Sequence, residues 1–302
     1  MILKILLKIT FISLLFIEFS CSTNKDPITT NQLIHIDSAV VWINDGIYMK
    51  FEGFENEYSF DDTLNFSMKL INQNSPEDLI IFISMWPPLT NYDIYNENNQ
   101  LVFEYPTIYG ALEFRDTLSV GDSLFESLEW NQSSNVSEYE YHEPKVYSGY
   151  YMIKGTFRGN NLTAAKHLIK WIKITEAGDP LFPFIYRDWQ YKPVDSLVTS
   201  LIIRNRTSKN LSYTLNQNNP LNIYYVTNTL TQDTVLSFRI NDLPNIQNKI
   251  EFSSHSDKLI YNYGISENDS LLIGLWGAYH LIFELNCLER TFIASQIITL
   301  YN

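Results

Sequence analysis

Residues 148–153 read Ser148-Gly149-Tyr150-Tyr151-Met152-Ile153, and a later segment reads Trp276-Gly277-Ala278-Tyr279-His280-Leu281. In both segments a Gly-x-Tyr triplet follows a loop and opens an apolar stretch that favours a β-strand. The two glycines lie 128 positions apart (277 − 149). The recurrence of this pattern indicates that one structural unit occurs twice in the chain.

Tyr151 and Tyr279 have the setting of tyrosine corners. In immunoglobulin-like sandwiches, a Tyr near the start of strand F turns its hydroxyl back onto the preceding backbone. In antibody domains the residue two positions later is a disulfide Cys, but here Ile153 and Leu281 stand there. We therefore predict an all-β chain of two tandem immunoglobulin-like β-sandwiches, each held by apolar packing, after a lipoprotein signal peptide.

Other features recur in the same order along the chain. Thr63–Asn72 and Asp195–Arg204 both alternate apolar and polar residues, as strands with one buried face do. The paired positions are Asn72 with Asn205 (205 − 72 = 133), Ile94 with Ile223 (223 − 94 = 129) and Leu112 with Ile250 (250 − 112 = 138). Duplication of one sandwich is the preferred interpretation. The alternative is two unrelated sandwiches that share generic strand patterning.

The domain boundary is expected in Glu176–Pro183, which carries one Gly and two Pro after a predicted strand. A chain of 302 residues is also long enough for two domains. The predicted organisation is a signal peptide (1–20), a tether (21–32), a first sandwich (33–178) and a second sandwich (179–302).

The N-terminal segment has the features of a secretory signal. Lys4 and Lys8 precede an apolar stretch, Ile9–Ile17, which ends before Ser20-Cys21. A Cys directly after a small residue resembles the bacterial lipoprotein signal, which implies lipid attachment at Cys21. We expect a lipid-anchored protein of the bacterial cell envelope, on the periplasmic or surface side of the outer membrane. An ordinary cleaved signal with an incidental Cys is the alternative.

Composition limits the classes of partner. Apolar residues make up 45% of the chain and aromatic residues 15%, enough for sizeable cores. The formal net charge of −13 repels phosphates and anionic headgroups, so we expect no nucleic-acid partner and no membrane contact except through the lipid. The two cysteines, Cys21 and Cys287, are not expected to pair, because Cys21 ends the leader.

Part of the chain, about Thr63–Phe157, resembles a known family, the BsuPI-type proteinase-inhibitor domain, a small immunoglobulin-like sandwich of bacteria. The residues that carry the resemblance are Asn72, Tyr92-Asp93-Ile94 with Leu101-Val102-Phe103, Leu118-Ser119-Val120-Gly121-Asp122 before Trp130, and Gly149-Tyr150-Tyr151. The departures are Leu89-Thr90-Asn91 for the usual Ser-Gly-Gln, Asn99 for the hairpin Gly and Phe103 for a Trp. The resemblance implies an immunoglobulin-like fold, with protease inhibition as one candidate activity.

No catalytic motif occurs in the sequence. It contains no Gly-x-Ser-x-Gly elbow, His-Glu-x-x-His, Gly-rich phosphate loop or Cys-x-x-Cys. The five histidines are scattered, and no two have the spacing of metal ligands. We expect a protein that is not an enzyme and that uses no cofactor or metal.

Two aromatic segments are candidate partner-binding loops. Trp86 precedes two prolines in a stiff loop, and Tyr139, Tyr141, His142 and Tyr147 lie in a second loop. The alternative is that these rings plug the open ends of the sandwich. The leading prediction is a non-catalytic module that binds a protein or peptide, with proteinase inhibition as one form. A glycan-binding surface lipoprotein and a structural spacer in an envelope complex are the rivals.

Overall fold

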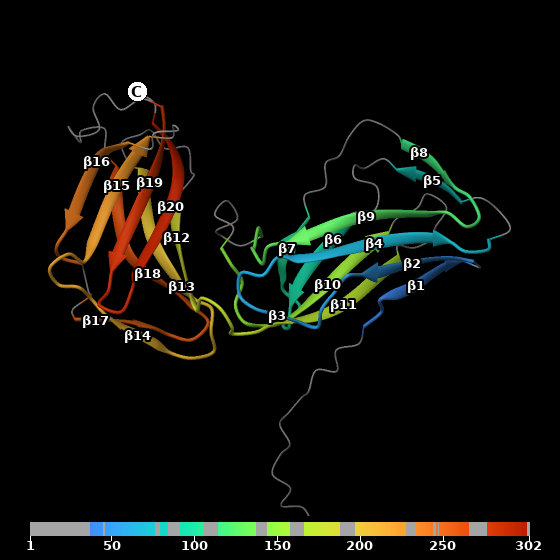
Figure 1. The fold of residues 1–302 in the computed structure, drawn as a ribbon, viewed down its shortest axis with the longest axis horizontal. Coiled ribbons are helices and arrows are strands. Elements are labelled where there is room, and N and C mark those ends of the chain that lie inside the picture. Colours follow the sequence, from blue (N-terminus) through green and yellow to red (C-terminus); the bar gives the residue numbers. More distant parts are fainter. Residues whose placement is uncertain are drawn as a thin grey trace, which may run out of the picture. The chain divides into compact units, whose positions relative to one another are not determined.

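The structure is a computed structural model, and it describes residues 37–44, 46–75, 79–83, 91–105, 114–136, 144–157, 166–187, 197–227, 233–243, 246, 248–265 and 277–300. Every regular element in these ranges is a β-strand, so the predicted all-β class is confirmed (Figure 1). Within them no helix is long and apolar enough to span a bilayer. The leader, the tether and Cys21 lie outside the described residues.

The N-terminal half, residues 37–175, contains two facing sheets and a two-stranded ribbon. One sheet has the order β1-β2-β4-β9: β1 (Val40–Asn44), β2 (Ile47–Glu52), β4 (Leu64–Asn72) and β9 (Ser123–Trp130). The other has the order β3-β11-β10-β6-β7: β3 (Glu57–Tyr58), β11 (Lys166–Ile174), β10 (Gly149–Phe157), β6 (Asn91–Asn96) and β7 (Leu101–Glu104). The ribbon pairs β5 (Leu79–Ile83) with β8 (Phe114–Leu118).

The C-terminal half, residues 181–300, has the same kinds of sheet. One has the order β12-β13-β18: β12 (Leu181–Arg187), β13 (Leu197–Asn205) and β18 (Ser256–Ile265). The second has the order β16-β15-β19-β20: β16 (Thr234–Ile240), β15 (Leu221–Thr227), β19 (Gly277–Asn286) and β20 (Thr291–Leu300). The ribbon pairs β14 (Leu211–Thr214) with β17 (Lys249–Phe252).

The alternation of apolar residues creates the cores. In β4 every second side chain is buried, from Leu64 to Leu70, and these side chains meet Tyr151 and Ile153 of the facing sheet in one hydrophobic cluster. A second cluster, which includes Leu201 and Phe283, fills the C-terminal half. Each fully buried Leu, Ile or Phe contributes about 1.5–3 kcal/mol by leaving water. The chain therefore has two separate cores and belongs to the β-sandwich class.

Strand pairing follows one pattern in both halves. Nine strands of the N-terminal half, β2 and β4–β11, correspond in order and in pairing to β12–β20. The register gives one correspondence directly. Leu118 is opposite the first residue of β5, and Phe252 is opposite the first residue of β14. Leu118 therefore corresponds to Phe252, an offset of 134 (252 − 118). Leu112, which was matched with Ile250, lies outside the described residues.

One strand begins within the segment Glu176–Pro183, where the domain boundary is expected. This strand, β12, starts at Leu181 and contains Pro183. Pro183 lies opposite Ile203 of β13, on a strand that pairs on one side only. An edge strand accommodates Pro at a position where the backbone nitrogen is directed away from the ladder, because no ladder hydrogen bond is then lost.

Candidate functional site

The predicted site residues Trp86, Tyr139, Tyr141 and His142 lie outside the described residues, as does Cys21. Tyr147 is described, and it contacts the C-terminal half. The Arg204 guanidinium lies 4.7 Å from the centre of its ring, and its hydroxyl donates to Asp257 Oδ1 at 3.2 Å. Burial raises the pKa of Tyr147 to about 12. Both its ring and its hydroxyl are therefore engaged within the chain.

The predicted tyrosine corner at Tyr151 is confirmed. The Tyr151 hydroxyl donates to the Tyr147 carbonyl at 2.9 Å, four residues upstream. The side chain is buried, and this burial raises the pKa of its phenol above the usual range. Tyr279 is also buried near the start of β19, the strand that corresponds to β10. The Gly-x-Tyr segments thus belong to the scaffold.

Arg206 is the centre of a polar contact between the halves. Its guanidinium donates to the Val146 carbonyl at 3.0 Å, to Asp61 Oδ1 at 2.8 Å and to Gln132 Oε1 at 3.1 Å. Its Cζ also lies 4.0 Å from the centre of the Phe60 ring. The side chain is 1% exposed, and this burial lowers its pKa, although the Asp61 carboxylate acts in the opposite direction. A buried guanidinium needs such a full set of acceptors.

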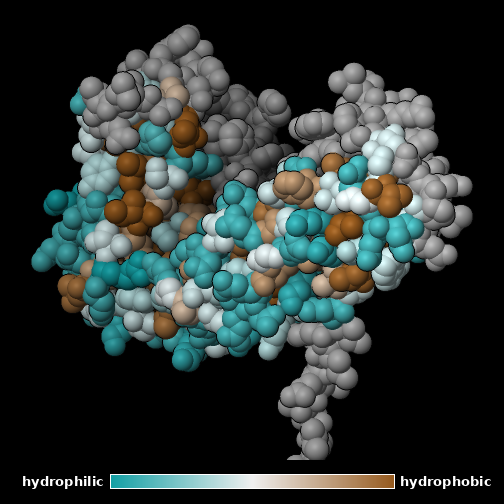
Figure 2. Space-filling model, turned by 45° about the vertical axis from the view of Figure 1, so that its right-hand side comes forward, coloured by the Kyte–Doolittle hydropathy of each residue, from teal (hydrophilic) through white to brown (hydrophobic). Residues whose placement is uncertain are grey.

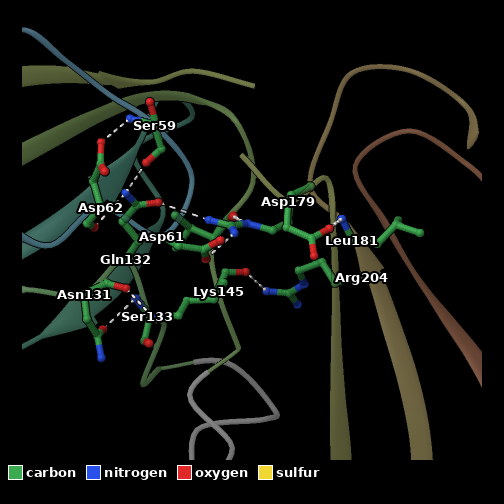
Figure 3. Close-up of polar contacts among 12 residues, drawn as sticks. Ser59, Asp61, Asp62, Asn131, Gln132, Ser133, Lys145, Asp179, Leu181 and Arg204 are labelled. Carbon is green, nitrogen blue, oxygen red and sulfur yellow. Dashed lines mark hydrogen bonds and ion pairs between the residues drawn. The ribbon is translucent and has the colours of Figure 1, made fainter. Parts of the chain in front are cut away.

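Arg204 makes a second contact of this kind. It forms a bidentate pair with Asp257, with both N–O distances 2.7 Å, and donates to the Lys145 carbonyl at 2.9 Å. Figure 3 shows the Arg204 guanidinium directed at Lys145, with a dashed line for the hydrogen bond to the Lys145 carbonyl. Ser148 adds two contacts, from its N–H to the Arg206 carbonyl and from its hydroxyl to His255 Nε2. We call the residues that make these contacts the junction cluster: Asp61, Gln132, Lys145, Val146, Ser148, Arg204, Arg206, His255 and Asp257.

Sequence reasoning missed the junction cluster. The segment Asn205–Asn210 was interpreted only as the loop that corresponds to the one after Asn72. The single signal was a pair of arginines, Arg204 and Arg206, on either side of an Asn in an acidic chain. The hydrogen-bond partners of their guanidinium groups lie 53 to 145 residues away, and no local pattern connects them.

A second surface feature is the outer face of the sheet β1-β2-β4-β9. We call it the Trp42 face and define it by its outward side chains: Val40, Trp42, Tyr48, Lys50, Lys69, Ile71 and Phe125. Trp42 is 55% exposed and Phe125 is 60% exposed, although both are large and apolar. Figure 2 shows hydrophobic residues standing between hydrophilic ones on the molecular surface.

Ring packing and charge pairing give the Trp42 face its character. Trp42 is opposite Tyr48, and their ring centres are 4.9 Å apart with a 50° angle between the planes. Lys50 and Lys69 both pair with the carboxylate of Glu52 between them. The face therefore combines aromatic area with two lysines that share the carboxylate of Glu52.

The described residues contain neither a metal-binding cluster nor an activated thiol. In those ranges no three His, Cys, Asp or Glu side chains are close enough to hold a metal ion. Cys287 is buried and unpaired, and burial raises the pKa of its thiol to about 11. A thiol of this kind is largely protonated at neutral pH and is a poor nucleophile.

No protein-family model and no curated protein matches the chain. Solved structures match at low similarity. A DUF4785 family protein from Legionella pneumophila is 8% identical, with a TM-score of 0.23, over 84% of this chain and 57% of that one. The YadV chaperone is 11% identical (TM-score 0.21; 83% and 99% covered), and a β-glucuronidase from Parabacteroides merdae is 12% identical (TM-score 0.25; 78% and 28% covered). At these TM-scores none of them supports an inference about function.

Proposed function

We propose that this protein is a lipid-anchored, non-catalytic protein-binding module of the bacterial cell envelope, and that the Trp42 face contacts the partner. The observation that carries the proposal is the exposure of Trp42 and Phe125 on one face of one sheet. Exposed aromatic residues that gather on one face are typical of protein interfaces, where they supply large contact area at low entropic cost.

The remaining predicted parts fit the same proposal. Acylation at Cys21 would anchor the chain, and the tether leads directly into β1, which carries Trp42. The predicted loops around Trp86 and Tyr139–His142 would extend the contact surface. The resemblance to the BsuPI-type domain makes a protease one candidate partner. The matched strand pairing of the halves supports duplication of one sandwich, with the junction cluster joining the two copies.

The test is site-specific photocrosslinking with the full chain in the cells that make it. A photoreactive phenylalanine analogue at position 42 or 125 is expected to give the same crosslinked protein, and at exposed Ile297 of β20 it should not. Phe125→Ala should remove the product obtained from position 42. Equal products from all three positions would refute the Trp42 face as the binding surface. A panel of proteases incubated with the full chain tests inhibition separately.

Glycan binding is the second candidate, favoured by the exposed pair of rings at Trp42 and Tyr48. Sugar rings stack on such aromatic side chains. A glycan array probed with wild type and with Trp42→Ala tests it, because a specific glycan signal should disappear in the variant.

A further inference from the structure

The backbone of β9 has one free side. β9 pairs with β4 and with no other described strand, so it is an edge of its sheet. The Asn72 N–H donates to the Asp122 carbonyl, which places the even-numbered residues of β4 and β9 in hydrogen-bonded pairs. The odd-numbered residues of β9 therefore direct their N–H and C=O groups away from β4.

A second contact supports this direction. The Glu129 carbonyl accepts the Tyr92 hydroxyl at 2.7 Å, which requires that it point away from the ladder with β4. Within the described ranges no group pairs with the backbone of Ser123, Phe125 or Ser127. Three successive outward residues thus present unpaired donors and acceptors, as an incoming strand requires.

Two other edges of the N-terminal half are partly occupied by other groups. At the start of β1, Ser38 exchanges two backbone hydrogen bonds with Ile169, at 2.8 and 3.0 Å. At β7, the Asn135 side chain accepts from the Glu104 N–H at 2.9 Å and donates to the Glu104 carbonyl at 2.7 Å. Asn135 therefore stands in for a neighbouring strand. Such devices disfavour edge-to-edge pairing, and within the described ranges none of them covers Ser123, Phe125 or Ser127 of β9.

The corresponding strand of the C-terminal half is also protected. β18 corresponds to β9, and its register with β13 shifts between Leu201 and Ile202, so that Ile260 is an extra residue. It carries Lys258 as well, whose ammonium donates to the Glu251 carbonyl. A bulge and a lysine both disfavour strand addition. β9 pairs with β4 over eight residues without a shift and contains no Lys or Pro.

We propose that the outer edge of β9 receives an extended, basic segment of the partner protein as an additional β-strand. The inference rests on the proposed function, because it identifies the kind of partner that binds beside the Trp42 face. Main-chain hydrogen bonds to Ser123, Phe125 and Ser127 provide the pairing, and the exposed Phe125 ring contacts the alternate side chains of the added strand.

Charge selects a basic strand rather than a second copy of this chain. Glu126 is half-buried on the core side of the edge, and Glu129 is exposed on the outer side. A strand with Lys or Arg opposite these carboxylates is favoured, and an uncharged apolar strand is disfavoured by the desolvation of Glu126. Self-pairing would bring two copies of both glutamates together in a chain of net charge −13.

The test uses the full chain in detergent and a bead-displayed library of random nine-residue peptides. The sequences of the peptides that bind are expected to alternate between two kinds of side chain, as strands do, and to be enriched in Lys and Arg. Ser127→Pro removes only an outward N–H, so it should weaken these binders at least tenfold, whereas Ser127→Thr should leave them within twofold. Glu126→Gln should weaken Lys-containing binders about threefold. N-methylation of alternate peptide residues should abolish binding, and methylation of the residues between them should not.

Three outcomes would overturn the inference: no binders, binders that Ser127→Pro does not weaken, or binders without basic residues. If Ser127→Pro fails to fold, the N-methylated peptides decide the question on the wild-type chain. Crosslinking from position 42 that persists in Ser127→Pro would refute strand addition and leave the proposed function intact. If the chain with the photoreactive residue at position 42 or 125, and no other change, gives no specific crosslinked protein, the proposed function itself is contradicted.

Discussion

Asn72 and Asn205 occupy the same corner in the two halves of the chain. Each ends a central strand and is fully buried. Each donates its side-chain amide to the carbonyl of the last residue of a ribbon strand, Leu118 at 2.9 Å or Phe252 at 3.2 Å. Each amide therefore ties the end of a central strand to the end of a ribbon strand, at the point where the long strand pair gives way to the short ribbon.

Replacement of either corner asparagine should destabilise the fold. Asn205→Ala is expected to lower the free energy of unfolding by about 3 kcal/mol, and Asn72→Ala by about 2 kcal/mol. Asn205 has the larger effect because it also bonds to Lys209, Ser253 and Thr207. Urea unfolding measures both values. Asn65→Ala, on an exposed position of β4, should change the stability by less than about 0.5 kcal/mol.

The tyrosine corner should contribute to stability through its hydroxyl alone. Tyr151→Phe removes the bond to the Tyr147 carbonyl and is expected to cost about 1–2 kcal/mol, since a buried acceptor loses its donor. Thermal unfolding of this variant is compared with that of Tyr150→Phe, whose side chain is exposed on the same strand. Equal melting temperatures for the two variants would contradict the role of the corner.

The junction cluster should couple the unfolding of the two cores. Arg206→Met leaves the Asp61 carboxylate and the Gln132 carbonyl without their buried donor and is expected to cost about 3 kcal/mol. We expect calorimetry to show one transition in wild type and two in the variant. Arg239→Met, on an exposed position of β16, is the control and should leave one transition. A single transition in Arg206→Met would show that other contacts couple the halves.

The pair formed by Asp179 and Arg290 should give a pH-dependent contribution. Burial opposes ionisation of Asp179, but the bonds from Arg290 and from the Leu181 N–H outweigh it, and the pKa of this carboxyl is lowered. A carboxyl whose pKa is lower in the folded state stabilises the fold fully at pH values above its unfolded pKa of about 3.9. This stabilisation is lost as the pH falls through the folded-state pKa. Wild type should exceed Asp179→Asn by about 0.5–1 kcal/mol at pH 7, because the pair is partly exposed. The difference should disappear toward pH 2 in urea unfolding, and a difference that grows at low pH would contradict the assignment.

Two turn glycines separate the cost of backbone strain from that of a clash. Gly46 has φ +90°, and a Cβ there would lie 2.5 Å from the Ser75 backbone N, whereas Gly121 has the same φ with open space around it. Gly121→Ala is expected to cost about 1 kcal/mol and Gly46→Ala clearly more, because the backbone must also move. Urea unfolding of both variants gives the difference, and equal values would show that the backbone at Asn74 and Ser75, after Asn72, moves without cost.

Local patterns predicted much of the scaffold but little of the surface chemistry. The alternation in β4 and the Gly-x-Tyr at Tyr151 are local, and both led to the observed structure. The contacts of Arg206 reach residues 60 to 145 positions away, so they depend on how the chain folds back on itself. Trp42 lies in β1, and its exposure depends on which face of that sheet meets the other sheet.

The junction cluster has a consequence for the history of the chain. In the register of the corner asparagines, Arg204 and Arg206 correspond to Ile71 and Gln73 (204 − 133 and 206 − 133). The Asn205 corner contacts the other half and carries arginine on both sides of the asparagine. The Asn72 corner carries Ile71 and Gln73 there instead. Under the proposed duplication, arginine at these two positions supplies guanidinium groups that reach Asp61, Gln132 and Lys145, contacts that Ile71 and Gln73 have no guanidinium to make.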